Sequence, residues 1–249
     1  MGGENGPGEI EVAPGLWISD LLCAWLPERK AVVVADLHLG FEAVAAADGA
    51  CFPNRQKPVL LRRLGAILDR FRPSLVVSAG DFKHNFGKGA RLEIDEVREV
   101  VEYLDSKADL SFVRGNHDNF LAGALPPGQS LPESIGLGRF RVAHGHREQG
   151  TPPKGVVATI LAHEHPSLRL RDTVGGRSSA PAFLFEPATG TLVLPALSPL
   201  APGSDILRAR PLSPGLRASG LDGFRLTAAT GEGLLDFGPV GALRKWEAE

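Results

Sequence analysis

The side chains best suited to chemistry fall in five short segments, and each segment follows an apolar run. They are Asp36-x-His38, Gly80-Asp81, Gly115-Asn116-His117-Asp118, His144-Gly145-His146 and His163-Glu164-His165. All seven histidines of the chain lie in or beside these segments, with His84 three residues after Asp81. Imidazole nitrogen combined with carboxylate oxygen suits Mn, Fe, Zn, Co or Ni, whereas an all-oxygen set suits Mg or Ca. The pattern therefore predicts a transition-metal site.

The spacing also indicates what such a site could do. In an extended strand end, side chains two residues apart point the same way, so Asp36 and His38 can reach one cation. One carboxylate can bridge two cations roughly 3.5–4 Å apart, and such a pair can clamp a phosphate and generate hydroxide near neutral pH. A single Asp-x-His is common by chance, but five such segments in order, each behind a strand, are specific.

The elements that must position these side chains alternate between strand and helix. Apolar, β-branched runs at 31–35, 75–79 and 110–113 predict three buried strands. Helical spacing of apolar residues predicts helices at 59–71, closed by Pro73, and at about 92–106. This is a βαβ rhythm, in which ligands bind beyond the carboxyl ends of the strands. The first three polar segments should therefore converge.

The second half of the chain is rich in turns and short strands. We expect strands at 140–143, 156–161, 182–185, 191–194 and 224–227, with edge strands within 9–19 and at 168–171. The Pro-rich piece 195–214 reads as an ordered loop or surface crossing. No second boundary is evident, so we expect one α/β (α+β) domain over 1–249, with catalytic motifs in 36–165 and C-terminal strands and a Pro-rich loop in 182–249.

Composition sets limits on function and location. With 249 residues, of which 43% are hydrophobic, the chain can bury a sizeable core. Its net charge of -2 gives no global attraction to nucleic acid, although bound metals could supply local positive charge to a nuclease. Neither a signal peptide nor an apolar run of roughly 18 residues is present, which predicts a soluble, cytoplasmic protein. Cys23 and Cys51 lack CxxC spacing, and reduced thiols are favoured over a disulfide.

The five segments taken together resemble the calcineurin-like metallophosphoesterase superfamily, over Asp36 to His165, about half the chain. The finer motifs Ala-Asp-Leu-His-Leu-Gly, Gly-Asp-Phe-Lys-His, His-Gly-His-Arg and His-Glu-His-Pro are similar to a subgroup of small prokaryotic phosphoesterases. That subgroup includes ligase-associated DNA-repair endonucleases. The resemblance implies a four-layer αββα sandwich of two mixed β-sheets flanked by helices.

The resemblance also implies roles for individual residues. Two divalent ions, Mn²⁺ foremost with Fe, Zn, Co or Ni as alternatives, would be held by seven side chains. Asp36, His38 and His165 would hold the first metal, Asp81 would bridge, and Asn116, His144 and His163 would hold the second. His117 would protonate the leaving oxygen, and Asp118 would orient His117. One departure is Ala162, which replaces the usual glycine before the last His-x-His; alanine is tolerable there if the backbone is extended.

Several residues keep two interpretations. His84 is either a substrate or metal-shell contact or a plain loop histidine, and His146 is placed in the outer shell rather than among the direct ligands. Arg114 and Arg147 could bind a substrate phosphate or be surface arginines. Lys83 and Lys88 could line the same rim. The cluster Arg55-Gln56-Lys57 and Arg62-Arg63 is interpreted as a helix face in water rather than a nucleic-acid patch.

The predicted reaction is hydrolysis of a phosphodiester by a metal-bridging hydroxide, with His117 as general acid. Alternatives are a DNA endo- or exonuclease of a repair system, a phosphomonoesterase, a mononuclear hydrolase, and a non-catalytic scaffold with this fold. The partners expected are a phosphate-ester substrate, which could be nucleic acid, DNA-repair proteins and further copies of the chain, but no membrane.

Overall fold

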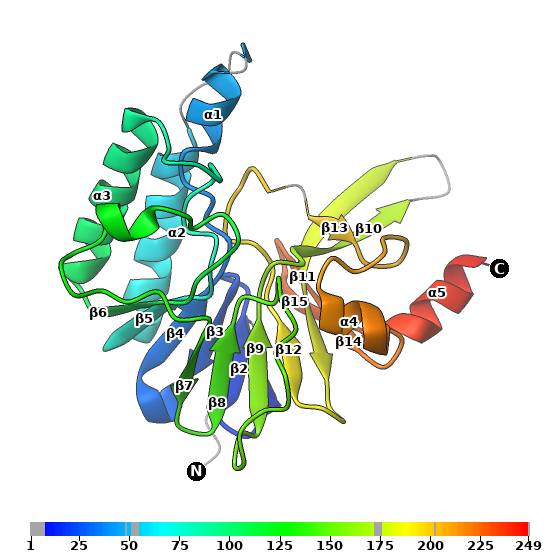
Figure 1. Cartoon of the computed structure of the whole chain (residues 1–249). Coiled ribbons are helices and arrows are strands. Elements are labelled where there is room, and N and C mark those ends of the chain that lie inside the picture. The colour runs from blue at the N-terminus through cyan, green and yellow to red at the C-terminus, as the bar shows by residue number, and fades with distance from the viewer. Residues whose placement is uncertain (1–7, 48, 51–54, 172–175, 202, 249) are drawn as a thin grey trace.

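The protein is built from two β-sheets stacked between helices, as seen in a computed structural model (Figure 1). The structure describes residues 8–47, 49–50, 55–171, 176–201 and 203–248. Helices α1 (Phe41–Ala47), α2 (Gln56–Phe71) and α3 (Arg91–Asp105) lie beside the first sheet, and α4 (Pro214–Ser219) and α5 (Val240–Ala248) beside the second. Two 3₁₀ turns, η1 (Pro27–Arg29) and η2 (Leu121–Ala124), join strands. The predicted fold of two mixed sheets with flanking helices is confirmed.

Within the described residues the first sheet has six strands in chain order. They are β1 (Glu9–Ala13), β2 (Leu16–Ser19), β3 (Cys23–Leu26), β4 (Ala31–Val34), β5 (Leu75–Ser78) and β6 (Asp109–Phe112). β4, β5 and β6 run parallel, with Val34 level with Ser78 and Ser78 level with Phe112. α2 and α3 form the crossovers between them, as the βαβ rhythm predicts. All three polar segments that follow these strands therefore emerge at one edge.

The second sheet has its main path in the order β13-β10-β11-β12-β9-β8-β7, with β14 paired to β11 and β15 to β14. Its strands are β7 (Ser134–Leu137), β8 (Phe140–Ala143), β9 (Ala158–Leu161), β10 (Pro166–Arg171), β11 (Arg177–Glu186), β12 (Thr191–Val193), β13 (Ser204–Asp205), β14 (Arg225–Thr230) and β15 (Gly233–Pro239). β8 and β9 are parallel neighbours, so His144 and His163 also follow strand ends at one edge.

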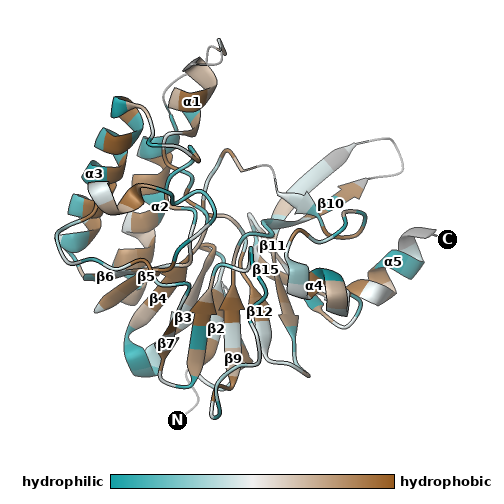
Figure 2. Cartoon of the chain, viewed as in Figure 1, coloured by the Kyte–Doolittle hydropathy of each residue, from teal (hydrophilic) through white to brown (hydrophobic). Residues whose placement is uncertain are grey.

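Strand alternation divides the apolar side chains between two cores. In β9, Ala158 and Ile160 belong to the core between the sheets, whereas Leu161 belongs to the core under α4 and α5. On the other side, Leu60, Leu64 and Ile67 of α2 form a stripe at helical spacing that packs on the first sheet. Figure 2 shows the strands of the first sheet largely brown, and both brown and teal stretches on α2 and α3.

Several predicted elements need correction. Residues 9–19 form a hairpin, β1 and β2, that turns at Gly15 with a φ of 74°, rather than one strand. Strands β3, β7, β13 and β15 and helices α1, α4 and α5 were not predicted. The stretch Leu168–Arg171 pairs only with β11 among the described residues, which confirms the edge strand.

The Pro-rich piece is not wholly a surface crossing. Leu197 and Ser198 are buried, and their amides donate to the carbonyls of Ala35 and Asp36 at 2.8 and 3.2 Å. The segment after β12 is therefore attached to the tip of β4, in the first sheet.

Cys23 is a free, fully buried thiol, and burial raises its pKa; Cys51 lies outside the described residues. Among the helices that the structure describes, none is long and apolar enough to cross a bilayer.

Candidate metal centre

Backbone conformation singles out the tips of the strands. Of the non-glycine residues described with positive φ, five are predicted metal ligands: Asp36 (54°), His38 (47°), Asp81 (49°), His163 (69°) and His165 (44°). Left-handed backbone is uncommon outside glycine, and such strain gathers at functional sites. The backbone thus turns sharply at the positions where the polar side chains must point to one place.

One cluster joins the two ends of the motif series. Asp36, His38 and His165 offer ligand atoms within 4.8 Å of one another. His38 Nε2 lies 3.3 Å from His165 Nε2, and His165 Nε2 lies 3.4 Å from Asp36 Oδ2. These three residues are the ones that the resemblance assigns to the first metal.

A second cluster lies beside it and shares a carboxylate. Asp81, His144 and His163 also offer ligand atoms within 4.8 Å, and Asn116 Oδ1 lies 3.1 Å from His144 Nε2. Asp81 Oδ2 lies 3.4 Å from His144 Nε2 and 3.8 Å from His38 Nε2. Asp81 therefore lies between the two clusters, where a bridging carboxylate would be.

The arrangement of lone pairs fits a cation. His144 Nδ1 donates to the carbonyl of Ala79 at 2.9 Å, so in neutral His144 the lone pair of Nε2 faces Asp81 and Asn116. Asp36 Oδ1 is buried and has no hydrogen-bond partner in the part of the chain that the structure describes. Convergent acceptors of this kind are unfavourable unless a cation or a proton lies among them. The residues present therefore fit the metals that the resemblance implies.

Burial and neighbouring charges shift the pKa values of the histidines and of Asp81 in this centre. Burial lowers the pKa of His38 to about 3 and, together with the charge of His144, lowers that of His163 to about 4, which leaves both rings neutral and able to bind a metal. Burial alone would lower the pKa of His144, but the hydrogen bond and charge of Asp81 and the charge of Asp36 raise it to about 9. Burial would likewise raise the pKa of Asp81, yet His144 and its other histidine neighbours hold it below its usual value. His144 and Asp81 thus share a proton where a cation would otherwise lie.

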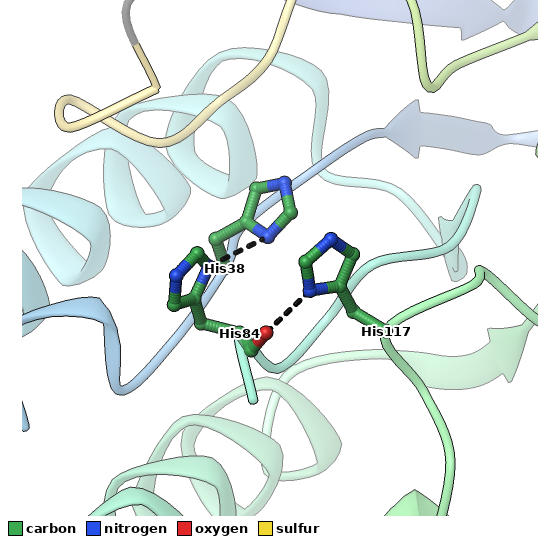
Figure 3. Close-up of side chains that lie close together, drawn as sticks. All are labelled: His38, His84 and His117. Atoms are coloured by element: carbon green, nitrogen blue, oxygen red, sulfur yellow. Dashed lines mark hydrogen bonds between the residues drawn. The ribbon is translucent and has the colours of Figure 1, made fainter. Parts of the chain in front are cut away.

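His38, His84 and His117 face one another at the edge of this centre (Figure 3). His117 Nδ1 donates to the carbonyl oxygen of His84, so its Nε2 faces the site, 3.8 Å from Asp81 Oδ2. His84 Nδ1 lies 3.3 Å from His38 Nδ1, and burial lowers the pKa of His84 to about 4. The Nδ1 of neutral His84 can accept a hydrogen bond from the Nδ1–H of neutral His38 there, which would leave His38 Nε2 free as a ligand. The structure thus places His84 against His38 and His117, two of the expected site residues.

Comparison with known proteins decides the family. A family model described as calcineurin-like phosphoesterase matches residues 29–179, more than half of the chain. The chain belongs to the calcineurin-like phosphoesterase family. This is a family of metal-dependent hydrolases, which agrees with the His and Asp clusters found here.

The fold has a solved counterpart. The crystal structure of the Pseudomonas putida nuclease MPE is 24% identical, with a TM-score of 0.62 over 89% of this chain and 96% of that one. YfcE, a phosphoesterase from E. coli, is 16% identical, with a TM-score of 0.40 over 70% of this chain and 83% of that one. None of the curated protein sequences matches the chain significantly.

In this phosphoesterase Asp118 does not have the predicted contact. Its Oδ2 accepts the amides of Asp81 and Gly115 at 2.9 and 2.8 Å, and its Oδ1 accepts that of Phe82 at 2.9 Å. His117 is held by the His84 carbonyl instead. The prediction that Asp118 orients His117 is therefore corrected: the carboxylate ties two strand tips together. Burial and then the charge of Asp81 raise its pKa to about 6, against the opposing effect of these amides.

Glycines allow the tips to pack. A Cβ at Gly115 would lie 2.1 Å from Asp81 Oδ1 and 2.2 Å from Asp81 N, and one at Gly80 would lie 2.5 Å from His144 Nδ1. These glycines make room for the other tips of the phosphoesterase centre. Ala162 has no positive φ, and its amide donates to the carbonyl of His144 at 3.0 Å, so alanine is accommodated as expected.

The less certain residues lie at different depths. His146 has its ring centroid 5.2 Å from that of His144, and its Nδ1 is buried. Among the described residues that nitrogen has no hydrogen-bond partner, and His146 belongs to neither ligand cluster. This agrees with an outer position. Arg147 is exposed and pairs with Glu133 at 3.2 Å. Arg114 Nε is buried without a hydrogen bond among the described residues, and no phosphate contact follows from it.

Three buried polar residues were missed by the sequence analysis. Gln56, taken as water-facing, is 1% exposed and donates to the carbonyl of His38 at 2.8 Å. Glu164 accepts the amides of Leu212 and Ser213 at 2.6 and 2.9 Å. Lys83, placed at the rim, is fully buried. Each lies next to a motif residue, but no periodic pattern distinguishes such a contact from an exposed polar side chain.

Proposed function

We propose that this phosphoesterase is a dinuclear enzyme that hydrolyses phosphodiesters. The observation that carries the proposal is the position of Asp81 Oδ2, 3.8 Å from His38 Nε2 in one cluster and 3.4 Å from His144 Nε2 in the other. Asp36, His38 and His165 would hold one divalent ion and Asn116, His144 and His163 the other, with Mn²⁺ the expected metal. Two such ions would neutralise the phosphate oxygens and provide a hydroxide near neutral pH.

The chain itself supplies a general acid. The Nδ1 of His117 is occupied by the carbonyl of His84, so a second proton on the ring must be carried by Nε2, which faces the centre. Such a proton can be given to the departing ester oxygen, a step typically worth 10²–10⁴-fold in rate. Asp118 supports this step indirectly, because it fixes Gly115 and Asp81 in the loops that hold the acid and the bridging carboxylate.

Preference for a diester is supported by a pocket beside His165. This pocket, of about 140 Å³, lies between α2 and the segment after β12, and its walls include Arg63, Ser167 and Ser198. A diester carries a second substituent that must lie beside the metals without reacting, whereas a monoester does not need this room. The pocket would receive the substituent that stays on phosphorus.

DNA is a second candidate substrate. The nuclease from Pseudomonas putida shares this fold over nearly the whole length of both chains, which supports a nuclease, although the net charge of -2 adds no general attraction to DNA. Cleavage of a single-stranded oligonucleotide at several salt concentrations tests this candidate. Absence of cleavage at low salt with Mn²⁺ present would refute it.

Metal counting and two variants test the main proposal. We expect two metals per chain, and faster hydrolysis of bis-aryl than of mono-aryl phosphate. His117→Ala should keep both metals and lose most turnover of an ester with a poor leaving group, whereas Asp81→Ala should also lose metal. One metal per chain would favour a mononuclear site, and two metals without turnover of either ester would favour a scaffold.

A further inference from the structure

An exposed aromatic ring lies against the predicted general acid. Phe86, in the loop between β5 and α3, has its ring centroid 3.7 Å from that of His117, with 31° between the planes. The side chain is nevertheless 57% exposed. A large apolar side chain that keeps over half its surface in water gains little from core packing. One side of the ring thus covers His117, and much of the remainder is exposed to solvent beside that histidine.

Two buried charged side chains, Lys83 and Glu93, hold the backbone of the loop that carries Phe86. Lys83 is fully buried, and its ammonium donates to the carbonyls of Asn85 and Gly87, the two residues that flank Phe86. The amides of His84 and Asn85 donate to Glu93 Oε1 at 3.0 and 2.7 Å, and Glu93 is also fully buried. Burying charged groups is costly unless they are bonded in this way. Such a device holds the backbone at residue 86 in one conformation before any ligand binds.

We propose that Phe86 is a specificity residue that stacks on a planar ring in the leaving group of the substrate, a nucleobase in particular. The inference rests on the proposed function, because His117 marks the side from which the leaving group departs. The ring of Phe86 lies on that histidine, whereas the pocket for the retained substituent lies beside His165. A base that leaves on the His117 side would meet the exposed part of the Phe86 ring.

Stacking makes a prediction that simple coverage of His117 does not. Replacing an aromatic side chain that stacks on a base by alanine typically weakens the interaction by roughly 5- to 150-fold. That loss should appear only for substrates with a ring in the leaving position. If Phe86 merely kept water from His117, every ester with the same leaving oxygen would slow alike.

The experiment uses dithymidine phosphate and two analogues in which hydrogen replaces one base or the other, with the Mn²⁺-loaded enzyme. The leaving oxygen is then chemically matched, and the products identify which sugar departs. Phe86→Ala and Phe86→Leu should lower kcat/KM for dithymidine phosphate roughly 5- to 150-fold. Both should barely affect the analogue that lacks the leaving-side base, and Phe86→Trp should restore the preference. Phe120→Ala is the matched control, because Phe120 is 58% exposed and has no ring contact with a site histidine among the described residues.

A calorimetric titration with thymidine, the product that departs, at saturating inorganic phosphate gives a readout that does not depend on turnover. Its dissociation constant should rise in Phe86→Ala by a similar factor, while that of inorganic phosphate stays unchanged. If wild-type enzyme cleaves none of the esters, the proposed function fails, but this titration still decides the role of Phe86. Equal losses for all three esters, or unchanged binding of thymidine, would overturn the stacking proposal.

Discussion

Replacing Asp118 by Asn tests the corrected role of this residue. The carboxylate oxygens accept three short bonds, from the amides of Asp81, Gly115 and Phe82. The amide of asparagine has one acceptor oxygen, whereas the carboxylate has two. In the better of its two orientations this oxygen accepts the amides of Asp81 and Gly115, and the NH₂ group then faces the amide of Phe82, which loses its acceptor. The amide of Lys83, at 3.4 Å from the same carboxylate oxygen, meets that NH₂ group as well.

The magnitude follows from these contacts. A buried donor left unsatisfied costs about 1–3 kcal/mol, and one strong and one weak bond are lost, so about 2–4 kcal/mol is expected. We take the lower half of that range, because burial also makes the charge of the Asp118 carboxylate costly, as its raised pKa indicates. The neutral amide of asparagine avoids part of that cost. For a chain of this length each kcal/mol lowers Tm by about 2–4 °C, so Tm should fall by roughly 4–12 °C.

Thermal unfolding of chelator-treated protein, followed by circular dichroism, measures this change. Asp109→Asn is the control, since Asp109 is an exposed carboxylate at the start of β6 and its replacement should stay within about 0.5 kcal/mol. A wild-type Tm for Asp118→Asn, with turnover alone reduced, would refute the reasoning. It would restore the role that the family resemblance implies, orientation of His117.

Three further predictions concern other parts of the centre. Gly115→Ala would place a Cβ 2.2 Å from Asp81 N, so the Mn²⁺ affinity measured by metal titration should be at least about tenfold weaker than that of wild type. The control Gly123→Ala should show none of this loss, because a Cβ there would meet no other described atom within 4 Å. The pKa of His144 is raised to about 9, so the folded protein keeps a proton that the unfolded chain releases above about 6.5. The stability that this proton adds to the folded protein is complete below pH 6.5 and is lost as pH rises through 9. The Tm of metal-free protein should therefore fall over that pH range. Mn²⁺ should abolish the fall, because the metal replaces the proton. His163→Gly should be more stable than His163→Ala by about 0.5–1 kcal/mol without metal, because both lack the ring but only alanine is strained at a φ of 69°; equal Tm values would exclude that strain.

The sequence predicts well those elements whose physics is local. Continuous apolar runs mark β4, β5 and β6, and apolar residues at helical spacing mark α2, predicted at 59–71 and observed as Gln56–Phe71. The polar residues that follow these strands meet because parallel strands end at one edge of a sheet. The convergence of the tips that carry Asp36, Asp81 and His117 was therefore accessible from sequence. The position of His144 beside Asp81, across from the second sheet, was implied only by the family resemblance.

Roles that depend on tertiary contacts were not accessible. An aspartate next to His117 can bind that ring or the backbone of a neighbouring loop, and only the path of the β5 loop decides for Asp118. Phe86 gave no signal, because one aromatic residue in a polar loop has no period. Gln56 and Lys83 were misread for the reverse reason, because polar side chains in charged surroundings predict exposure. The buried partner of Gln56 is the carbonyl of His38, far from it in sequence, and Lys83 folds back onto carbonyls of its own loop.

The positive φ angles at the ligands imply that the strained backbone must be supported from outside the motifs. The amides of Asp36 and His38 donate to the carbonyls of Gly80 and Asp81, at 3.2 and 2.9 Å, so the tips of β4 and β5 hold each other. On the other side, the carbonyl of Asp36 accepts the amide of Ser198 at 3.2 Å. Ser198 lies well beyond the last motif histidine, in the segment that crosses from the second sheet to the first. Because left-handed conformations of this kind persist only where surrounding structure over-determines them, we expect the segment that carries Ser198 to support metal binding without supplying a ligand.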